Sequence, residues 1–183
     1  MRIYLIRHPR PAVATGICYG RSDLPLAENA AHCATRLVPL LPPSAPVYSS
    51  PLIRCRQLAK LLHPAPNYDD RLREMDFGAW EMQAWESIGR EALDAWAAAP
   101  LDFVPPGGES VAAMRVRVNA FIAERKADAC PELVLVSHAG VMKTLVAELT
   151  GVPASLWLSA QFDYGTVSLI EEGRVAWYNR VAT

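Results

Sequence analysis

Two histidines directly follow buried-strand patterns that lie far apart in the sequence. The apolar run 3–6 ends in Arg7 and His8, and the run 133–137 ends in His138. Because α/β sheets build their sites at the carboxyl ends of their strands, we expect both imidazoles to face one pocket. Two imidazoles assisted by arginines can carry out phosphoryl chemistry without a metal ion. His8 is the expected nucleophile, whose neutral ring attacks phosphorus and forms a phosphohistidine that water then cleaves.

Positive charge around the phosphoryl oxygens is the second requirement of this chemistry. Arg7 stands beside His8, and Arg54 falls in the first turn of a helix predicted to start at residues 50–51, where free N–H groups favour an anion. Both arginines can form forked hydrogen bonds to phosphate. His138 adds a second imidazole, which a nearby phosphate dianion would hold in its charged form.

The third requirement is a proton for the leaving oxygen. Glu74, in a loop after a weak strand at 67–72, can give that proton and then activate water. Asp76 and Glu81 lie close enough in the sequence to compete for the role, and we rank both below Glu74.

Each candidate alone also has a plainer interpretation. Arg54 alone would be a surface helix residue, Glu74 an ordinary loop carboxylate and His138 a hydrogen-bonded core histidine. Their common position at strand-to-loop or strand-to-helix junctions favours a single site. The other two histidines, His32 and His63, are predicted to be surface or packing residues.

Composition bounds the class of protein. The chain has 183 residues, of which 51% are hydrophobic and 20% charged, enough for one globular domain with a real core. A net charge of −1 argues against a nucleic-acid or membrane-surface binder, although arginine outnumbers lysine by 15 to 3. The N-terminal residues lack the shape of a cleavable signal and no apolar run approaches membrane-spanning length, so we expect a cytoplasmic protein.

Four cysteines are scattered along the chain without a Cys-x-x-Cys pair. This spacing makes a zinc site improbable and favours reduced thiols. The alternative phosphatase pattern, Cys-x5-Arg, is also absent from the sequence.

Periodicity and turn residues predict alternating strands and helices. A Trp-rich segment interrupts the alternation and contains Trp80, Trp85, Trp96 and Phe103; these rings either pack a helical subdomain or stack on a flat substrate base. The expected elements are strands at 2–7, 47–49, 67–72 and 133–137, helices at 28–41, from 50 to about 62, at 109–128 and from about 141 to a stop at Gly151, and a closing hairpin of 166–171 and 174–179.

Several of these segments resemble, in order, the motifs of the histidine phosphatase superfamily, the phosphoglycerate-mutase-like proteins. The opening Leu5-Ile6-Arg7-His8 is similar to its first motif. The later matches are Ser49-Ser50-Pro51-Leu52-Ile53-Arg54-Cys55-Arg56-Gln57-Leu58-Ala59, Arg73-Glu74-Met75-Asp76-Phe77-Gly78-Ala79-Trp80-Glu81, Gly107-Gly108-Glu109-Ser110 and Val136-Ser137-His138-Ala139-Gly140-Val141.

The resemblance implies a fold and a set of roles. The fold is a three-layer α/β/α sandwich with a mostly parallel sheet of about six strands, one of them antiparallel, and a small helical lid insertion at 79–106 within a single domain. The activity is a phosphomonoesterase that forms a covalent phosphohistidine on His8 and uses no metal or cofactor. The partner is a small phosphate ester, and a homodimer is left open. The expected substrate-binding residues are Arg7, Arg54, His138, Tyr19, Gly20 and Ala139.

Within the family, the α-ribazole phosphatase branch of cobalamin synthesis is the most similar. The run 74–81, the loop 19–26 and the closing hairpin carry this resemblance, which implies α-ribazole 5′-phosphate as substrate. The chain departs from the family pattern at Pro9-Arg10-Pro11, where Gly-x-Thr is usual, and at Ala14, where Asn is usual. Pro9 lacks a backbone donor and biases His8 toward an extended conformation.

Two other functions stay open at this point. A phosphoglycerate mutase would use the same nucleophile, but we rank it lower because the family's mutases are longer. A broad-specificity phosphatase or a non-catalytic phosphate-binding module would share the fold, since fold alone does not imply activity. Only the Pro9 and Ala14 departures favour the non-catalytic alternative.

Overall fold

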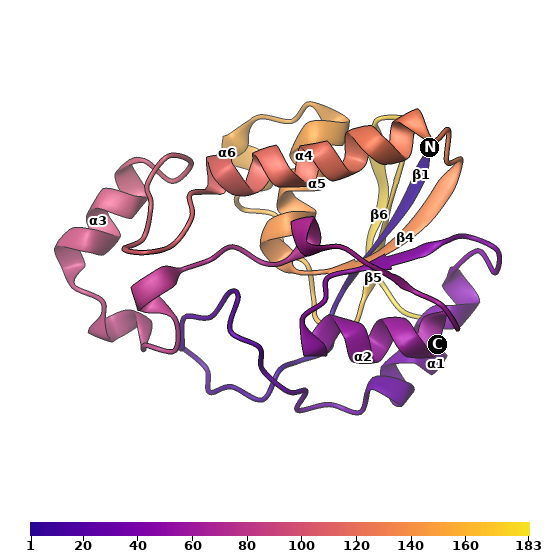
Figure 1. Ribbon diagram of the computed structural model, residues 1–183, viewed down its shortest axis with the longest axis horizontal. Helices are drawn as coiled ribbons and strands as arrows, with labels where there is room; N and C mark the ends of the chain where they lie inside the picture. Colours follow the sequence, from indigo (N-terminus) through magenta and orange to yellow (C-terminus); the bar gives the residue numbers. More distant parts are fainter.

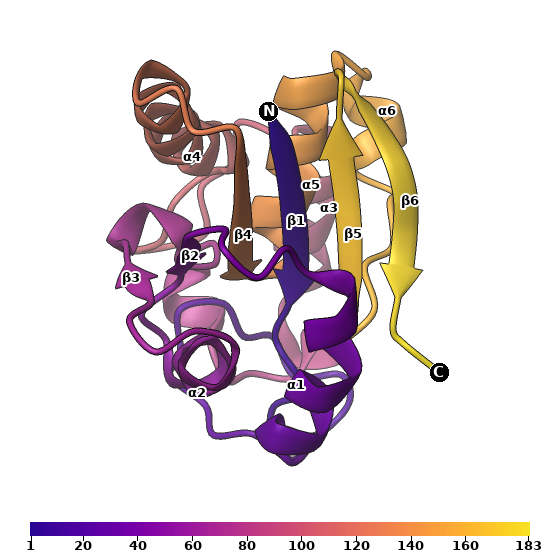
Figure 2. The ribbon, with the colours of Figure 1, turned by 90° about the vertical axis from the view of Figure 1, so that its right-hand side faces the viewer.

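The computed structural model describes residues 1–183 apart from the side chains of residues 154 and 155. Its centre is a six-stranded sheet in the order β3-β2-β4-β1-β5-β6. The strands are β1 (Arg2–Arg7), β2 (Val47–Ser49), β3 (Asn67–Tyr68), β4 (Glu132–Ser137), β5 (Val167–Glu171) and β6 (Arg174–Arg180). Among the described strands, only β5 runs opposite to the rest, since it pairs antiparallel with both β1 and β6 (Figure 2). The expected sheet is therefore confirmed.

Helices cover both faces of this sheet, which confirms the three-layer architecture (Figure 1). Helices α1 (Ala30–Leu37) and α2 (Ile53–Leu62) lie on one face. Helices α4 (Val111–Ala127) and α5 (Ala139–Thr150) lie on the other, with the short α6 (Ala154–Trp157) beside α5. Helix α3 (Arg90–Ala98) projects from one end of the molecule (Figure 1).

Strand β1 shows how the sequence builds two cores. Ile3 and Leu5 point to the face covered by α4 and α5, whereas Tyr4 and Ile6 point to the face covered by α1 and α2. All four side chains are at most 5% exposed, as expected for a central strand buried on both sides. Each buried leucine or isoleucine of this kind contributes about 1.5–3 kcal/mol of transfer free energy, which fixes the register of β1.

The candidate site lies at the carboxyl ends of β1 and β4. The two strands pair in parallel, with Arg7 opposite Ser137. After β1 the chain leads to α1 on one face, and after β4 it enters α5 on the other face. This divergence opens a crevice at the carboxyl ends of the strands. His8 and His138 are the first residues beyond the two strands, so both stand at that edge of the sheet.

Several element boundaries differ from the sequence-based prediction. The helix expected over 28–41 is α1 followed by a 3₁₀ turn, Val38–Leu40, because Pro39 cannot continue the α-helical hydrogen bonding. Helix α2 is capped by Leu52 rather than by Ser50, and the third strand has only two residues before a 3₁₀ turn at Asp70–Leu72. Helix α6 was not expected. Gly151 ends α5 in the left-handed conformation, as predicted, with φ of 70°.

The segment 79–106 contains more 3₁₀ and loop structure than the expected helical insertion. It runs through the turns Gly78–Trp80 and Trp85–Ser87 before α3. That this segment moves as a lid, and that residues 1–183 act as one domain, both stay predictions.

Candidate active site

His8 is held with its lone pair on one defined ring nitrogen. Its Nδ1 lies 2.7 Å from the carbonyl oxygen of Pro9, which can only accept, so Nδ1 carries the proton. Its Nε2 lies 3.2 Å from the Nε–H of Arg54, which can only donate, so Nε2 is unprotonated. Two independent contacts thus select the same neutral tautomer. Pro9 lacks a backbone donor, but its carbonyl oxygen sets the orientation of the ring.

Arg54 is fully buried, which is rare for an arginine and depends on its hydrogen bonds. Besides the bond to His8, its two terminal nitrogens donate to the carbonyl oxygens of Ser22, at 2.7 Å, and Gly20, at 2.5 Å. It is the second residue of α2, beyond the Leu52 cap. The guanidinium therefore links the His8 ring to the loop 20–22 that the sequence assigned to substrate binding.

Arg7 lines the same cleft as His8 and packs over an aromatic ring. The centre of its guanidinium is 3.6 Å from the centroid of the Tyr164 ring, and one terminal nitrogen donates to the carbonyl oxygen of Phe162 at 2.6 Å. Its Nε is buried and makes no hydrogen bond with the described residues. Stacking and a single fixed donor orient the fork while leaving donor capacity toward the crevice.

His138 is fully buried beside His8. Its ring centroid is 5.0 Å from that of His8 in an edge-on arrangement. Its Nε2 lies 2.8 Å from the hydroxyl of Ser50 and 3.5 Å from the Sγ of Cys55. The two imidazoles predicted to share a pocket are therefore neighbours.

Both histidines are held in their neutral form by their surroundings. Burial, and next the positive charge of Arg54, lower the pKa of His8 and of His138 well below the usual range. For His8 this favours the nucleophilic state at neutral pH. For His138 it acts against the charged form expected beside a phosphate, and a bound dianion would act in the opposite direction.

Glu74 reaches the site from a coil segment rather than from a helix or strand. One carboxylate oxygen accepts a hydrogen bond from the backbone N–H of Met75, and the other from that of Gly140, both at 3.0 Å. A Cβ on Gly140 would overlap this carboxylate, so a larger residue there would force the carboxylate to shift from its present position. Glu74 is half-buried and lines the same cleft as Arg7 and His8.

The loop at 20–22 is fixed by Glu81. This carboxylate accepts from the backbone N–H groups of Gly20, Arg21 and Ser22 at 2.9–3.0 Å, and also from the Ser22 hydroxyl. Burial alone would raise the pKa of Glu81, yet these bonds and one from Phe77 outweigh it and lower the pKa. Glu81 is thus an ionised anchor with its lone pairs in use, which sets it apart from Glu74 as a proton donor.

The remaining predicted residues have more specific places. Tyr19 lines the cleft, and its hydroxyl is 2.5 Å from that of Tyr164. Gly20 contributes its carbonyl oxygen to Arg54, and Ala139 is the first residue of α5, directly after His138. Asp76, the other competitor of Glu74, accepts from the backbone N–H of Gly78 and pairs with Arg21 at 3.4 Å.

The cleft has a volume of about 260 Å³ and mostly aromatic walls. Its lining residues are Arg7, His8, Ile17, Tyr19, Glu74, Phe77, Trp85 and Tyr164. Trp85 also stacks on Trp96 at 5.5 Å between centroids, and Trp80 stacks on Phe103 at the same distance. Of the four aromatic residues singled out in the sequence, one therefore faces the cleft and the others pack behind it.

Sequence reasoning missed Tyr164, which covers Arg7 and contacts Tyr19. A signal was present: the residue precedes the closing hairpin, and a hairpin strand antiparallel to β1 begins beside the end of β1. The backbone N–H of Gly165 indeed donates to the carbonyl oxygen of Arg7 at 3.1 Å. Ile17 and Trp85 reach the cleft because backbone hydrogen bonds join residues 16–18 to residues 82–85, a pairing that no local sequence pattern predicts.

The other features considered in the sequence are metal ligands, cysteines, the two remaining histidines and membrane-spanning segments. Among the described side chains, no three His, Cys, Asp or Glu residues gather as metal ligands would. All four cysteines are free. His32 is exposed on α1, and His63 is the residue that caps the end of α2. None of the described helices combines the length and the apolar character that crossing a membrane requires.

Comparison with known proteins places the chain in a family. The model of the histidine phosphatase superfamily (branch 1) matches residues 3–181. The adenosylcobalamin/α-ribazole phosphatase of Salmonella typhimurium is 36% identical over 169 residues, covering 86% of this chain and 84% of that protein. The α-ribazole phosphatase structure from Shigella flexneri is 29% identical with a TM-score of 0.82, covering 100% of this chain and 96% of that one.

A structure named phosphoglycerate mutase, from Thermus thermophilus, is also similar. It is 31% identical with a TM-score of 0.80, and the match covers 98% of this chain and 99% of that one. A protein of that name thus has nearly the same extent as this chain. The expectation that the family's mutases are longer does not hold for this structure, so chain length alone does not separate the two names.

Proposed function

The chain belongs to the histidine phosphatase superfamily, and on that premise we propose that it is a metal-independent phosphomonoesterase that acts through a phosphohistidine on His8. Its relatives include named phosphatases. The observation that carries the proposal is the state of His8: a neutral ring with its lone pair on Nε2, which contacts Arg54, edge-on to His138 and lining one cleft with Arg7.

The first chemical step forms the covalent intermediate. The Nε2 lone pair of His8 attacks phosphorus, the bond from phosphorus to the ester oxygen breaks, and Glu74 transfers its proton to that oxygen. Arg7, Arg54 and His138 surround the phosphoryl oxygens and stabilise the charge that they carry in the transition state. Arg54 exchanges its contact with the His8 lone pair for one with the phosphoryl group.

The second step returns the protein to its starting state. The Glu74 carboxylate takes a proton from water as the water oxygen attacks phosphorus, and the bond from phosphorus to Nε2 breaks. Inorganic phosphate leaves, Nε2 regains its lone pair, and Glu74 is again protonated. The proton stays on Nδ1 throughout, hydrogen-bonded to the carbonyl oxygen of Pro9, so the ring keeps its orientation.

We further propose α-ribazole 5′-phosphate as the natural substrate. The relatives that carry this name support it, and so do the aromatic walls of the cleft. Trp85 and Phe77 stand edge to face with 5.7 Å between ring centroids, and both line the cleft that contains His8. A flat heteroaromatic base can pack against such walls once its phosphate is in place.

The decisive experiment is steady-state kinetics on a panel of phosphomonoesters. The panel contains α-ribazole 5′-phosphate, phosphoserine, 3-phosphoglycerate and p-nitrophenyl phosphate, each assayed with and without a chelator. We expect the highest kcat/KM for α-ribazole 5′-phosphate, no effect of the chelator, and loss of all activity in His8→Ala. A requirement for added Mg²⁺ would refute the histidine mechanism.

A substitution of Trp85 tests the assignment of the substrate separately. Trp85→Leu should lower kcat/KM for α-ribazole 5′-phosphate more than for phosphoserine, which has no ring to stack. Tyr178→Leu is the matched control, because Tyr178 is an exposed aromatic residue on β6 that borders a different cavity. Equal losses on both substrates would remove the stacking argument.

A phosphoglycerate mutase is the second candidate, favoured by the similarity to the Thermus thermophilus structure. A mutase holds phosphohistidine against water while the product reorients. Incubation with 3-phosphoglycerate distinguishes the two activities: phosphate released in step with substrate loss indicates the phosphatase, and interconversion of phosphoglycerates without release indicates the mutase.

A further inference from the structure

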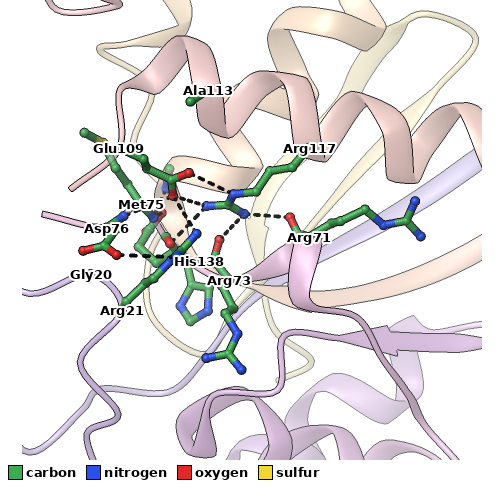
Figure 3. A network of polar contacts seen from close by, with 12 residues as sticks. Gly20, Arg21, Arg71, Arg73, Met75, Asp76, Glu109, Ala113, Arg117 and His138 are labelled. Atoms are coloured by element: carbon green, nitrogen blue, oxygen red, sulfur yellow. Dashed lines mark hydrogen bonds and ion pairs between the residues drawn. The ribbon is translucent and has the colours of Figure 1, made fainter. Parts of the chain in front are cut away.

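Arg117 and Glu109 form a partly buried ion pair, and Figure 3 shows their contacts with the segment that carries Glu74. We propose that both are positioning residues for the reaction, which fix the Glu74 carboxyl relative to His8 without touching substrate. This inference rests on the proposed function, since it assumes that Glu74 is the proton donor.

Arg117 lies on α4, and all three nitrogen atoms of its guanidinium group donate hydrogen bonds in this role. One terminal nitrogen donates to the carbonyl oxygens of Arg71 and Arg73, both at 2.7 Å. The other donates to the carbonyl oxygen of Glu74 itself at 3.1 Å and to Glu109 at 2.5 Å. Its Nε donates to the second oxygen of Glu109 at 3.2 Å. One side chain thus clamps three carbonyl groups that lead up to and include Glu74.

Glu109 holds the residues on the other side of Glu74. Its carboxylate accepts from the backbone N–H of Asp76 at 3.1 Å, and its own N–H donates to the carbonyl oxygen of Asp76 at 2.9 Å. It also accepts from Arg21 at 3.2 Å. Since Arg21 belongs to the loop that Arg54 and Glu81 anchor, the pair joins the substrate loop to the acid-bearing segment.

The reason for such a clamp lies in the backbone of residues 73–77. These residues form neither helix nor strand, so no ladder of hydrogen bonds holds them. Buried backbone groups still require partners, and here side chains supply them. Arg117 and Glu109 are 16% and 14% exposed, so their bonds compete little with water. Arg117 borders a surface hollow with Arg71 and Arg73 rather than the cleft that holds His8.

The test compares two substrates that differ in their need for a proton. The phenolate of p-nitrophenyl phosphate leaves without a proton, whereas the alkoxide oxygen of glycerol 2-phosphate must receive a proton as it leaves. Arg117→Met should lower kcat for glycerol 2-phosphate by about 100-fold, because a displacement near 1 Å can cost that much, and should affect p-nitrophenyl phosphate far less. Glu109→Gln and Arg117→Lys should show the same selectivity with smaller losses, and they decide the question if Arg117→Met does not fold.

A double variant separates positioning of Glu74 from general loosening of the fold. In the Glu74→Gln background, Arg117→Met should cost nothing further on glycerol 2-phosphate. The matched control is Arg115→Met, two residues along α4, whose side chain pairs with Glu148 and should leave both activities unchanged.

Two results would overturn the proposal: equal losses on the two esters, or losses that multiply with Glu74→Gln. The proposed function is tested separately by His8→Ala, which removes activity toward both esters whatever the role of Arg117.

Discussion

The two sides of the cleft are built in different ways. His8 and His138 follow β1 and β4, the paired central strands of the sheet, and Arg54 lies in the first turn of α2. Glu74, by contrast, lies in coil, between a 3₁₀ turn at Asp70–Leu72 and another at Gly78–Trp80. The phosphate side takes its geometry from regular secondary structure, whereas the acid side takes it from side-chain clamps and one glycine contact.

This difference teaches where substitutions can act selectively. A side chain at the end of a buried strand is fixed by many backbone bonds and packed residues, so changes outside the site have little leverage on it. A side chain on coil depends on a few identifiable bonds. We therefore expect the geometry of the phosphate side to be lost only when its own residues are substituted. The geometry of the acid side should also be lost when the residues that hold Glu74 are substituted.

The largest expected effect is the loss of the nucleophile. His8→Ala should lower kcat for p-nitrophenyl phosphate by at least about 10⁴-fold, because no other group of the site can form the covalent intermediate. Phosphate release under saturating substrate measures it. The matched control is His32→Ala, an exposed histidine of α1 whose removal should leave the rate unchanged. Residual activity within tenfold of the parent would show that the phosphate side works without His8.

The second-largest expected effect is the loss of the proton donor, Glu74. Glu74→Gln should lower kcat by about 10²–10⁴-fold for an alkyl phosphate, the usual contribution of general acid–base catalysis, and much less for p-nitrophenyl phosphate. Glu86→Gln, on an exposed turn in the Trp-rich segment, is the control. A uniform loss across both esters would assign Glu74 to phosphate binding or structure instead of proton transfer.

A smaller effect tests the glycine contact. Gly140→Ala places a methyl group against the Glu74 carboxylate and should lower the alkyl phosphatase rate by about tenfold to 100-fold. Its thermal midpoint should not fall, since alanine favours a helix over glycine by about 1 kcal/mol. Gly151→Ala should lower the thermal midpoint and leave the rate unchanged. The left-handed φ of Gly151 disfavours a side chain, and this residue lies at the opposite end of α5 from Gly140. Matching profiles for the two variants would disprove the contact.

The smallest effect concerns stability as a function of pH. The folded protein disfavours protonation of His8 and His138, so their contribution to stability is complete above the unfolded pKa of about 6.5 and is lost as the pH falls below it. Each histidine should add a slope of up to about 1.4 kcal/mol per pH unit in that window. Denaturant unfolding between pH 7 and 5 measures the slope, which should decrease in His8→Gln. An unchanged slope in that variant would contradict the neutral, buried state of the ring.

The same contrast explains what the sequence could predict. The strand ends that carry His8 and His138 were found from apolar runs, because a buried parallel strand leaves a continuous local signal. The start of α2 was placed two residues early, since Ser50 and Pro51 satisfy the local rules for a cap. The Ser50 hydroxyl accepts from the backbone N–H of Leu52 at 3.3 Å and also contacts His138, and the helix begins only after Leu52. That a tertiary partner shares this hydroxyl has no signature in a single sequence.

Residues that reach the site through tertiary contacts were correspondingly harder to find. The Arg117 clamp spans α4 and a coil segment more than forty positions away in the chain, and Tyr164 meets Tyr19 across 145 positions. In both cases the side chain looks ordinary in its local context: an arginine on a helix, and a tyrosine before a strand. Only the folded arrangement gives them a function.

The central place of β1 also has a consequence for biosynthesis. Strand β1 pairs with β4 and β5, which begin at Glu132 and Val167, so its hydrogen-bonding edges stay unpaired until those later strands have been translated. A topology with such distant partners folds slowly and exposes apolar segments in the meantime. The apolar residues of β1 should therefore stay exposed, and prone to aggregation, until β4 and β5 have been synthesised.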